Sequence, residues 1–108
     1  VLSNAGGANA RRVVAANEAE KYFETVRGAD DVCEPKPSPS GLIAIARENG
    51  WDPGACVYVG DSPSDGAAAK AAGMMALGCA WGAHEADDLD ASHDFVVRTV
   101  SELRKTLL

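Results

Sequence analysis

The segment at residues 56–73 constrains the fold more than any other part of the sequence. It reads CVYVGDSPSDGAAAKAAG, so an apolar strand runs into two acids four residues apart and then into an alanine-rich helix. A carboxylate at the tip of a buried strand is costly to desolvate unless a positive charge meets it. We therefore expect Asp61 and Asp65 to belong to a binding site at the end of this strand.

Strand-like and helical segments alternate along the whole chain. Short apolar strands separated by helices are typical of an α/β layer fold with a mostly parallel sheet. We expect residues 1–108 to form one such unit. The expected strands are 1–2, 23–26, 56–59, 74–80 and 95–97, the expected helical segments are 8–17, 18–22, 38–50, 62–73 and the stretch from Thr99 onward, and the expected loops are 27–37 and 81–92.

Composition limits the possible classes of protein. The chain has 108 residues, of which 46% are hydrophobic and 24% charged, as expected for a globular domain. Its net charge of -6 and the lack of a basic stripe argue against a nucleic-acid partner, and no apolar run is long enough to span a membrane. Three widely spaced cysteines without a CxxC pair argue against a zinc site and predict a reducing, cytoplasmic location.

Three polar segments follow expected strand ends, where open parallel sheets bind their ligands. They are Ser3-Asn4, the loop around Lys36, and Gly60-Asp61. Ser3 and Asn4 precede a Gly-Gly turn and would form a cluster of hydrogen-bond donors suited to phosphate, although an ordinary helix cap explains the same residues.

Charge at the other two strand ends predicts a site for a metal ion and a phosphoryl group. Asp61 and Asp65 offer the hard oxygen ligands that Mg²⁺ prefers, although Asp65 in a first helical turn also complements the helix dipole. Prolines on both sides of Lys36 hold its backbone in one direction, so its ammonium could neutralise phosphoryl charge. A surface turn, or a Ser-Pro site that another protein recognises, is the alternative for Lys36.

The order LeuSerAsn, LysPro and GlyAspSerProSerAsp resembles the haloacid dehalogenase superfamily, in particular phosphatases of the phosphoglycolate phosphatase type. The similarity extends to AlaAlaGly at 71–73, to Trp81-Gly82 and to the closing SerGluLeu helix. The resemblance implies a three-layer, Rossmann-like core and a Mg²⁺-dependent phosphate-monoester hydrolase. A small phosphorylated metabolite is the implied substrate.

The resemblance also implies a role for each matching residue. Ser3 and Asn4 correspond to the phosphate-binding donors, and Lys36 to the lysine that balances the charge of the nucleophile and the phosphate. Asp61 corresponds to a Mg²⁺ ligand. Asp65 corresponds to the acid that positions metal-bound water or the lysine, and Ser62 is a weaker candidate.

The nucleophile of this superfamily is the first aspartate of an Asp-x-Asp motif after an apolar strand, and the chain lacks it. Asp88 and Asp90 have the spacing, but no strand precedes them. We therefore expect the C-terminal part of a core whose central nucleophile strand and cap are absent, and which folds properly only with a missing N-terminal segment or an oligomer partner. The isolated chain should have no turnover.

Two other functions remain open at this point. The chain can be a non-catalytic module of the same fold that binds a partner or phosphate, or part of a phosphomutase. A dehalogenase is disfavoured, because those enzymes carry Ser-Asn where Gly60-Asp61 stand. His84 and His93 flank an acidic stretch that we expect to be a solvated loop, and Cys56 and Cys79 fall within strands as inert core residues.

Overall fold

The computed structural model describes all 108 residues. Strands and helices alternate over residues 57–107, which confirms the predicted α/β class. None of the helices is long and apolar enough to cross a membrane. The elements in chain order are α1 (Gly7–Ala16), the 3₁₀ turns η1 (Glu20–Tyr22) and η2 (Ala29–Asp31), α2 (Ser40–Asn49), η3 (Pro53–Ala55), β1 (Val57–Gly60), α3 (Pro63–Ala71), β2 (Met75–Cys79), α4 (Ala86–Leu89), β3 (Phe95–Val97) and α5 (Val100–Leu107).

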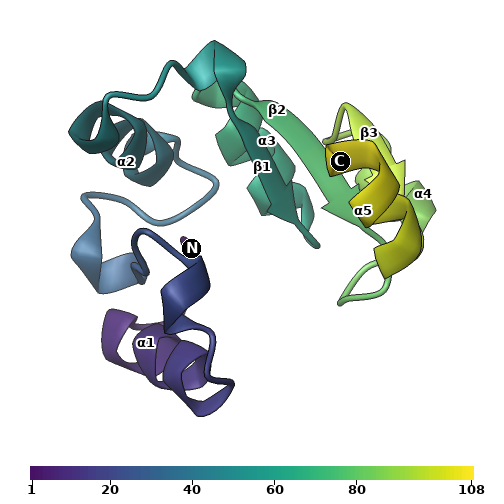
Figure 1. Cartoon of the computed structure of the whole chain (residues 1–108). Helices are drawn as coiled ribbons and strands as arrows, with labels where there is room; N and C mark the ends of the chain where they lie inside the picture. The colour runs from purple at the N-terminus through teal and green to yellow at the C-terminus, as the bar shows by residue number, and fades with distance from the viewer.

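The three strands form one parallel sheet in the order β1-β2-β3. Helix α3 packs against β1 and β2, and α5 lies against β3 on the other side of the sheet (Figure 1). Side chains alternate between these faces, so Ala76 joins the core beneath α3 while Leu77 packs with Cys79, Val97 and Leu103 of α5. The result is a small three-layer arrangement, as the sequence predicted.

Local sequence explains where the central helices begin and end. Pro63 occupies the first turn of α3, where its missing N–H costs nothing, and the Ser62 hydroxyl lies 3.0 Å from the Asp65 carboxylate. The predicted end of α2 at Gly50 is confirmed, since this glycine takes a left-handed φ of 69°. These boundaries fix the turns that precede and follow β1.

The N-terminal part of the chain is almost free of sheet structure. A single parallel bridge joins Leu2 to Arg27, and the expected strand at 23–26 is wrong. Phe23 is 44% exposed, and the segment meets the N-terminus only through the bridge and a hydrogen bond from the Val1 ammonium to the Thr25 carbonyl, so its strand-like composition does not extend into a ladder. The expected strand at 1–2 is reduced to the residue that forms this bridge.

The segment 81–92, expected to be a loop with one acidic turn, contains the short acidic helix α4. The expectation that its flanking His93 is solvated is wrong. His93 is 5% exposed and packs against Gly78 of β2 and Gly66 of α3. Its Nδ1 atom lies 3.1 Å from the Leu89 carbonyl oxygen. A Cβ at Gly66 would collide with the Ser92 carbonyl and the imidazole, and one at Gly78 would press tightly on the ring. Hydrophobic patterning does not reveal this constraint.

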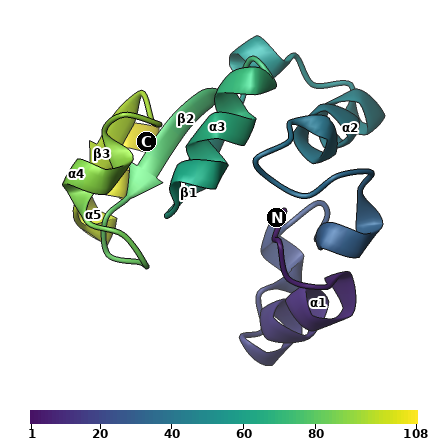
Figure 2. The ribbon, with the colours of Figure 1, turned by 180° about the vertical axis from the view of Figure 1, so that it is seen from behind.

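The N-terminal part of the chain (residues 1–50) and the C-terminal part (residues 51–108) share one apolar core. Leu2 and three residues of α2 pack with residues of α3 and β2 (Figures 1 and 2). In both views α1 and α2 lie on one side, and the sheet with α4 and α5 on the other. This shared core brings the end of the N-terminal strand segment close to β1. Its buried members are Leu2, Leu42, Ile45, Ala46, Ala68, Ala69, Ala72, Met74 and Ala76.

Candidate active site

The ammonium of Lys36 lies at the end of β1 and is almost fully enclosed. Its Nζ atom donates to Asp65 Oδ1 at 2.6 Å, to the Tyr58 hydroxyl at 2.9 Å and to the Leu2 carbonyl at 3.1 Å. The Lys36 side chain is only 9% exposed and that of Asp65 only 7%. A buried ion pair of this kind holds both charges in fixed positions.

The Asp65 carboxylate joins this pair to the start of α3. Its Oδ2 atom accepts from the backbone N–H groups of Asp61 at 3.0 Å and Ser62 at 3.1 Å, and from the Ser62 hydroxyl. Gly60 makes this possible, because a Cβ at that position would collide with the Asp65 side chain. Asp65 thus both caps the helix and anchors the lysine.

The two charges stabilise each other. Burial alone would lower the pKa of Lys36, but hydrogen bonds to Asp65 and Tyr58 outweigh it and raise that pKa. Burial alone would raise the pKa of Asp65, but the Lys36 ammonium outweighs it and lowers that pKa. The pair is therefore ionised across the neutral pH range.

Asn4 follows the short N-terminal strand segment and holds the loop that contains Lys36. Its Oδ1 accepts from the Lys36 backbone N–H, and its Nδ2 donates to the Lys36 carbonyl, both at 3.0 Å. The Ser3 hydroxyl accepts from the Ala5 N–H at 3.1 Å, so its own proton is left to donate elsewhere. The structure thus brings Ser3 and Asn4 to the site, with Asn4 engaged in positioning Lys36. Phosphate binding by either residue stays a prediction.

Asp61 offers the most accessible carboxylate of the site. Its Oδ2 atom accepts one long hydrogen bond, from the Ala83 N–H at 3.3 Å, and the residue is exposed. No group of three or more His, Cys, Asp or Glu side chains is arranged to hold a metal ion. Asp61 fits a Mg²⁺ site in which water and phosphate supply the other ligands. Asp65, with both oxygens engaged, fits better as the partner of Lys36, and metal ligation by Asp61 and Asp65 stays a prediction.

Two contributors to this site were missed in the sequence. Tyr58 sits in the middle of β1, donates from its hydroxyl to the Leu2 carbonyl at 2.8 Å and accepts from Lys36. The signal for it was a lone phenol in a strand that otherwise presents Val, Cys and Gly. His84 lies with Nδ1 3.1 Å from the Asp61 carbonyl oxygen, and no sequence pattern indicated this contact.

Comparison with known proteins identifies the family. The family model described as haloacid dehalogenase-like hydrolase matches residues 1–79, which include Lys36, Asp61 and Asp65. The chain belongs to this family. The predicted resemblance to haloacid dehalogenase superfamily phosphatases is thereby confirmed.

The relatives of this haloacid dehalogenase-like chain include phosphatases. It is 42% identical over 98 residues to the probable phosphatase IndB of Dickeya dadantii, a match that covers 89% of the chain and 42% of the relative. It is 38% identical over 88 residues to phosphoglycolate phosphatase of Escherichia coli, covering 81% of the chain and 35% of the relative. The chain thus spans less than half the length of these relatives.

A solved structure shows the same arrangement. A haloacid dehalogenase family hydrolase from Deinococcus radiodurans, with bound phosphate and sodium, matches with a TM-score of 0.84 and 26% identity. The match covers 98% of this chain and 49% of that one. The fold seen here therefore corresponds to about half of that longer hydrolase.

Proposed function

We propose that this chain is the C-terminal part of the core of a Mg²⁺-dependent phosphatase that hydrolyses a small phosphorylated metabolite. The observation that carries the proposal is the buried Lys36–Asp65 pair, 2.6 Å apart, beside Asp61 at the strand end. Leu2 and Asn4, on either side of Ser3, both bond to Lys36. A fixed ammonium that faces anionic oxygens stabilises the charge that develops during phosphoryl transfer.

The residues of the chain divide the work between binding and positioning. Ser3 donates its hydroxyl proton to a phosphoryl oxygen, and Lys36 neutralises charge on the phosphoryl group and its nucleophile. Asp65 and Asn4 hold Lys36 by its two ends. Asp61 would hold Mg²⁺, which supplies Lewis-acid polarisation of the phosphate when bound.

The reaction proceeds by two displacements at phosphorus. A carboxylate outside this chain attacks the phosphorus atom, and the bond from phosphorus to the ester oxygen breaks while that oxygen takes a proton from a general acid, also outside this chain, and leaves as the alcohol. Water then hydrolyses the aspartyl-phosphate to free phosphate and the carboxylate. Two supports come from relatives: two are named phosphatases, and the Deinococcus radiodurans hydrolase binds phosphate.

The proposed function also requires a nucleophile strand from outside the chain and a reducing compartment. An N-terminal segment or an oligomer partner supplies the nucleophile strand that completes the sheet, in keeping with relatives more than twice as long as the matched region. Cys33, Cys56 and Cys79 are all free thiols, which supports a cytoplasmic location.

Hydrolysis of p-nitrophenyl phosphate with and without Mg²⁺ tests this function. The 108-residue chain should be inert, and a longer protein that includes the segment encoded upstream should turn over only with Mg²⁺. Acid quenching of that protein should trap one acyl phosphate per active site. Mg²⁺-dependent turnover by the 108 residues alone, abolished by Asp61→Asn, would contradict the external nucleophile. A longer protein that binds phosphate without turnover would favour the non-catalytic module.

A further inference from the structure

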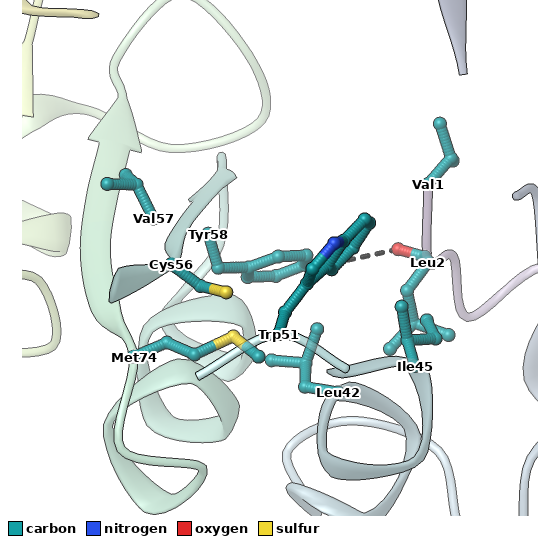
Figure 3. Close-up of a pocket in the computed structure, with 9 residues that line it drawn as sticks. All are labelled: Val1, Leu2, Leu42, Ile45, Trp51, Cys56, Val57, Tyr58 and Met74. Atoms are coloured by element: carbon teal, nitrogen blue, oxygen red, sulfur yellow. Dashed lines mark hydrogen bonds between the residues drawn. The ribbon is translucent and has the colours of Figure 1, made fainter. Parts of the chain in front are cut away.

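The two ends of β1 differ in chemistry. A cavity of ≈ 290 Å³ near the start of the strand is lined by nine hydrophobic residues, among them Trp51 and Cys56, and contains no charged side chain (Figure 3). Asp61 directly follows the other end of β1 and is exposed. The groups that can act on a charged ligand therefore lie at the Asp61 end of the strand.

The loop after β2 contacts Asp61 at three points. The Ala83 N–H donates to Asp61 Oδ2 at 3.3 Å. Gly82 lies so close to the carboxylate that a Cβ at this position would collide with it. The Nδ1 atom of His84 lies 3.1 Å from the Asp61 carbonyl oxygen. Because a carbonyl oxygen only accepts, His84 Nδ1 carries the hydrogen of this bond.

The glycine at position 82 is required by the Asp61 side chain. Among the glycines, only Gly50 and Gly73 have a positive φ, so the φ of Gly82 suits alanine as well. The three heavy atoms nearest to a Cβ at Gly82 are Oδ2, Cβ and Cγ of Asp61, the last two at 2.7 and 2.8 Å. An alanine at position 82 would therefore act first on the Asp61 carboxylate.

The backbone of Asp61 is held from two directions. Its N–H donates to Asp65 Oδ2 at 3.0 Å, at the start of α3, and its carbonyl accepts from His84 in the loop after β2. Since the Ala83 N–H engages Oδ2, the Oδ1 atom is the carboxylate oxygen without a hydrogen bond. The loop thus leaves one oxygen of Asp61 available to a ligand.

We propose that the loop Gly82–His84 is a positioning element for Asp61, which aims the Oδ1 atom at a divalent cation. Gly82 makes room for the carboxylate, and the Ala83 N–H and the His84 imidazole hold it in one orientation. Gly82 and His84 touch neither the cation nor the phosphate, and both act through Asp61. The use of Asp61 by a cation rests on the proposed function, whereas the fixed orientation of its carboxylate does not.

The orientation of Asp61 is measured by NMR in the metal-free, full protein that the gene encodes. Three-bond couplings from Asp61 Cγ to the backbone nitrogen and carbonyl carbon report the χ1 rotamer, and the parent should show one rotamer. Gly82→Ala should shift these couplings to another rotamer or to an average. Gly54→Ala is the matched control, because a Cβ there lies at an ordinary 3.4 Å from its nearest neighbour, Asp52. Unchanged couplings in Gly82→Ala would overturn the proposal.

Binding of Mn²⁺, followed by electron paramagnetic resonance, measures the consequence for a cation. Partners that orient a metal ligand change the affinity for the metal without contacting it, so Gly82→Ala should weaken Mn²⁺ binding by about 10-fold or more. The thermal midpoint should stay that of the parent, because the displaced side chain is exposed. Equal Mn²⁺ dissociation constants for Gly82→Ala and Gly54→Ala would contradict the positioning of a metal ligand.

A pair of histidine variants tests the other contact of the loop. His84→Ala removes the donor to the Asp61 carbonyl and should weaken Mn²⁺ binding by about 2- to 10-fold, as for the loss of one hydrogen bond. His84→Asn keeps an N–H donor close to the place of Nδ1 and should restore most of the affinity. Equal losses in both variants would refute the assigned role of His84. If Gly82→Ala does not fold, this pair decides the proposal.

Failure of the proposed function gives a different result from failure of the positioning. A parent that binds no Mn²⁺, while Gly82→Ala still turns the Asp61 side chain, would refute the magnesium site and retain the positioning of Asp61. A parent that binds Mn²⁺, with couplings and affinity unchanged in Gly82→Ala, would retain the magnesium site and refute the positioning.

Discussion

The regions before and after Trp51 are built in opposite ways. Residues 51–108 contain all three paired strands, and helices cover parts of both sheet faces. Residues 1–50 contain two helices and short turns, with one isolated bridge between Leu2 and Arg27. The C-terminal region therefore pairs most of its strand backbone within one sheet, apart from the free edge of β1, whereas the N-terminal region bonds its backbone through helices, turns and the bridge to Arg27.

The apolar contacts between the two regions are those of the shared core, and the polar ones include those of the candidate site. Lys36 and Asn4 come from the N-terminal region, and Asp65 and Tyr58 from the C-terminal region. A buried ion pair is an unusual way to join two parts of a small fold, because desolvation offsets much of its attraction. The comparison teaches that a buried polar pair joins the two regions at the candidate site, while the sheet provides the local stability; the proposed function gives a reason for this pair.

Replacing Lys36 should produce the largest loss of stability, because its ion pair with Asp65 connects the two regions. Lys36→Met leaves Asp65 buried without its counter-charge, and we expect a loss of about 3–5 kcal/mol in the free energy of unfolding. Urea denaturation measures this loss. Lys70→Met, on the exposed side of α3, is the control and should stay within about 0.5 kcal/mol of the parent. Equal stability of the two variants would show that the pair does not join the regions.

A core truncation should damage the C-terminal region itself. Leu77 is 1% exposed in the centre of β2, so Leu77→Ala should cost about 2–5 kcal/mol through lost contacts and a cavity. Leu107→Ala is the matched control, since Leu107 is 48% exposed at the end of α5. Hydrogen exchange should show faster exchange across β1 to β3 in the first variant only. Faster exchange confined to residues 1–50 would contradict the conclusion that the sheet provides the local stability.

The pH dependence of stability should distinguish the contribution of the Lys36–Asp65 pair from that of the sheet. The lowered pKa of Asp65 contributes stability that is present above its unfolded value, about 4, and is lost as the pH falls through the folded value. The raised pKa of Lys36 contributes stability that is present below about 10.4 and is lost as the pH rises through the folded value. A plateau between these limits is expected in urea midpoints measured against pH.

The Lys36→Met variant is the control for this profile. Asp31 and Glu48 also have lowered pKa values, through hydrogen bonds to the Gly28 N–H and to Arg27 respectively, so part of the acid limb will remain. The difference between parent and variant isolates the pair and should vanish below the folded pKa of Asp65. A difference that stays constant into acid would indicate a packing effect without a charge effect.

The smallest loss of stability is expected at a helix cap far from the Lys36–Asp65 pair. The Thr99 hydroxyl accepts from the Glu102 N–H at 3.1 Å at the start of α5, so Thr99→Ala should cost about 1 kcal/mol. Ser101→Ala, at an exposed position of the same helix, should cost less. Circular dichroism during urea titration measures both. A larger loss for Ser101→Ala would refute the assigned cap.

Sequence patterns predicted the elements that are stabilised locally. The Gly50 and Thr99 boundaries and the three strands after Trp51 follow from turn chemistry and short apolar runs. The failure at 23–26 and the burial of His93 have a different cause. Both depend on what lies nearby in space: residues 23–26 meet the N-terminus at isolated contacts only, and the imidazole packs against two glycines that are distant in sequence.

The candidate site was predictable to the extent that each charge stood at a strand end. Lys36, Asp61 and Asp65 were found in this way, and the structure brings them together. The clamp of Asn4 on the Lys36 peptide and the role of Tyr58 required the fold, because each joins residues more than twenty positions apart. No local pattern carries that information.

The most direct test of the central claim is the turnover of p-nitrophenyl phosphate by the longer, upstream-extended protein in Mg²⁺, with Lys36 replaced by methionine. Loss of a fixed charge at the phosphoryl site should lower kcat/KM by about 10²-fold or more, while Lys70→Met leaves it unchanged. Equal kcat/KM for the two variants would contradict the assignment of Lys36 and Asp65 to phosphoryl transfer.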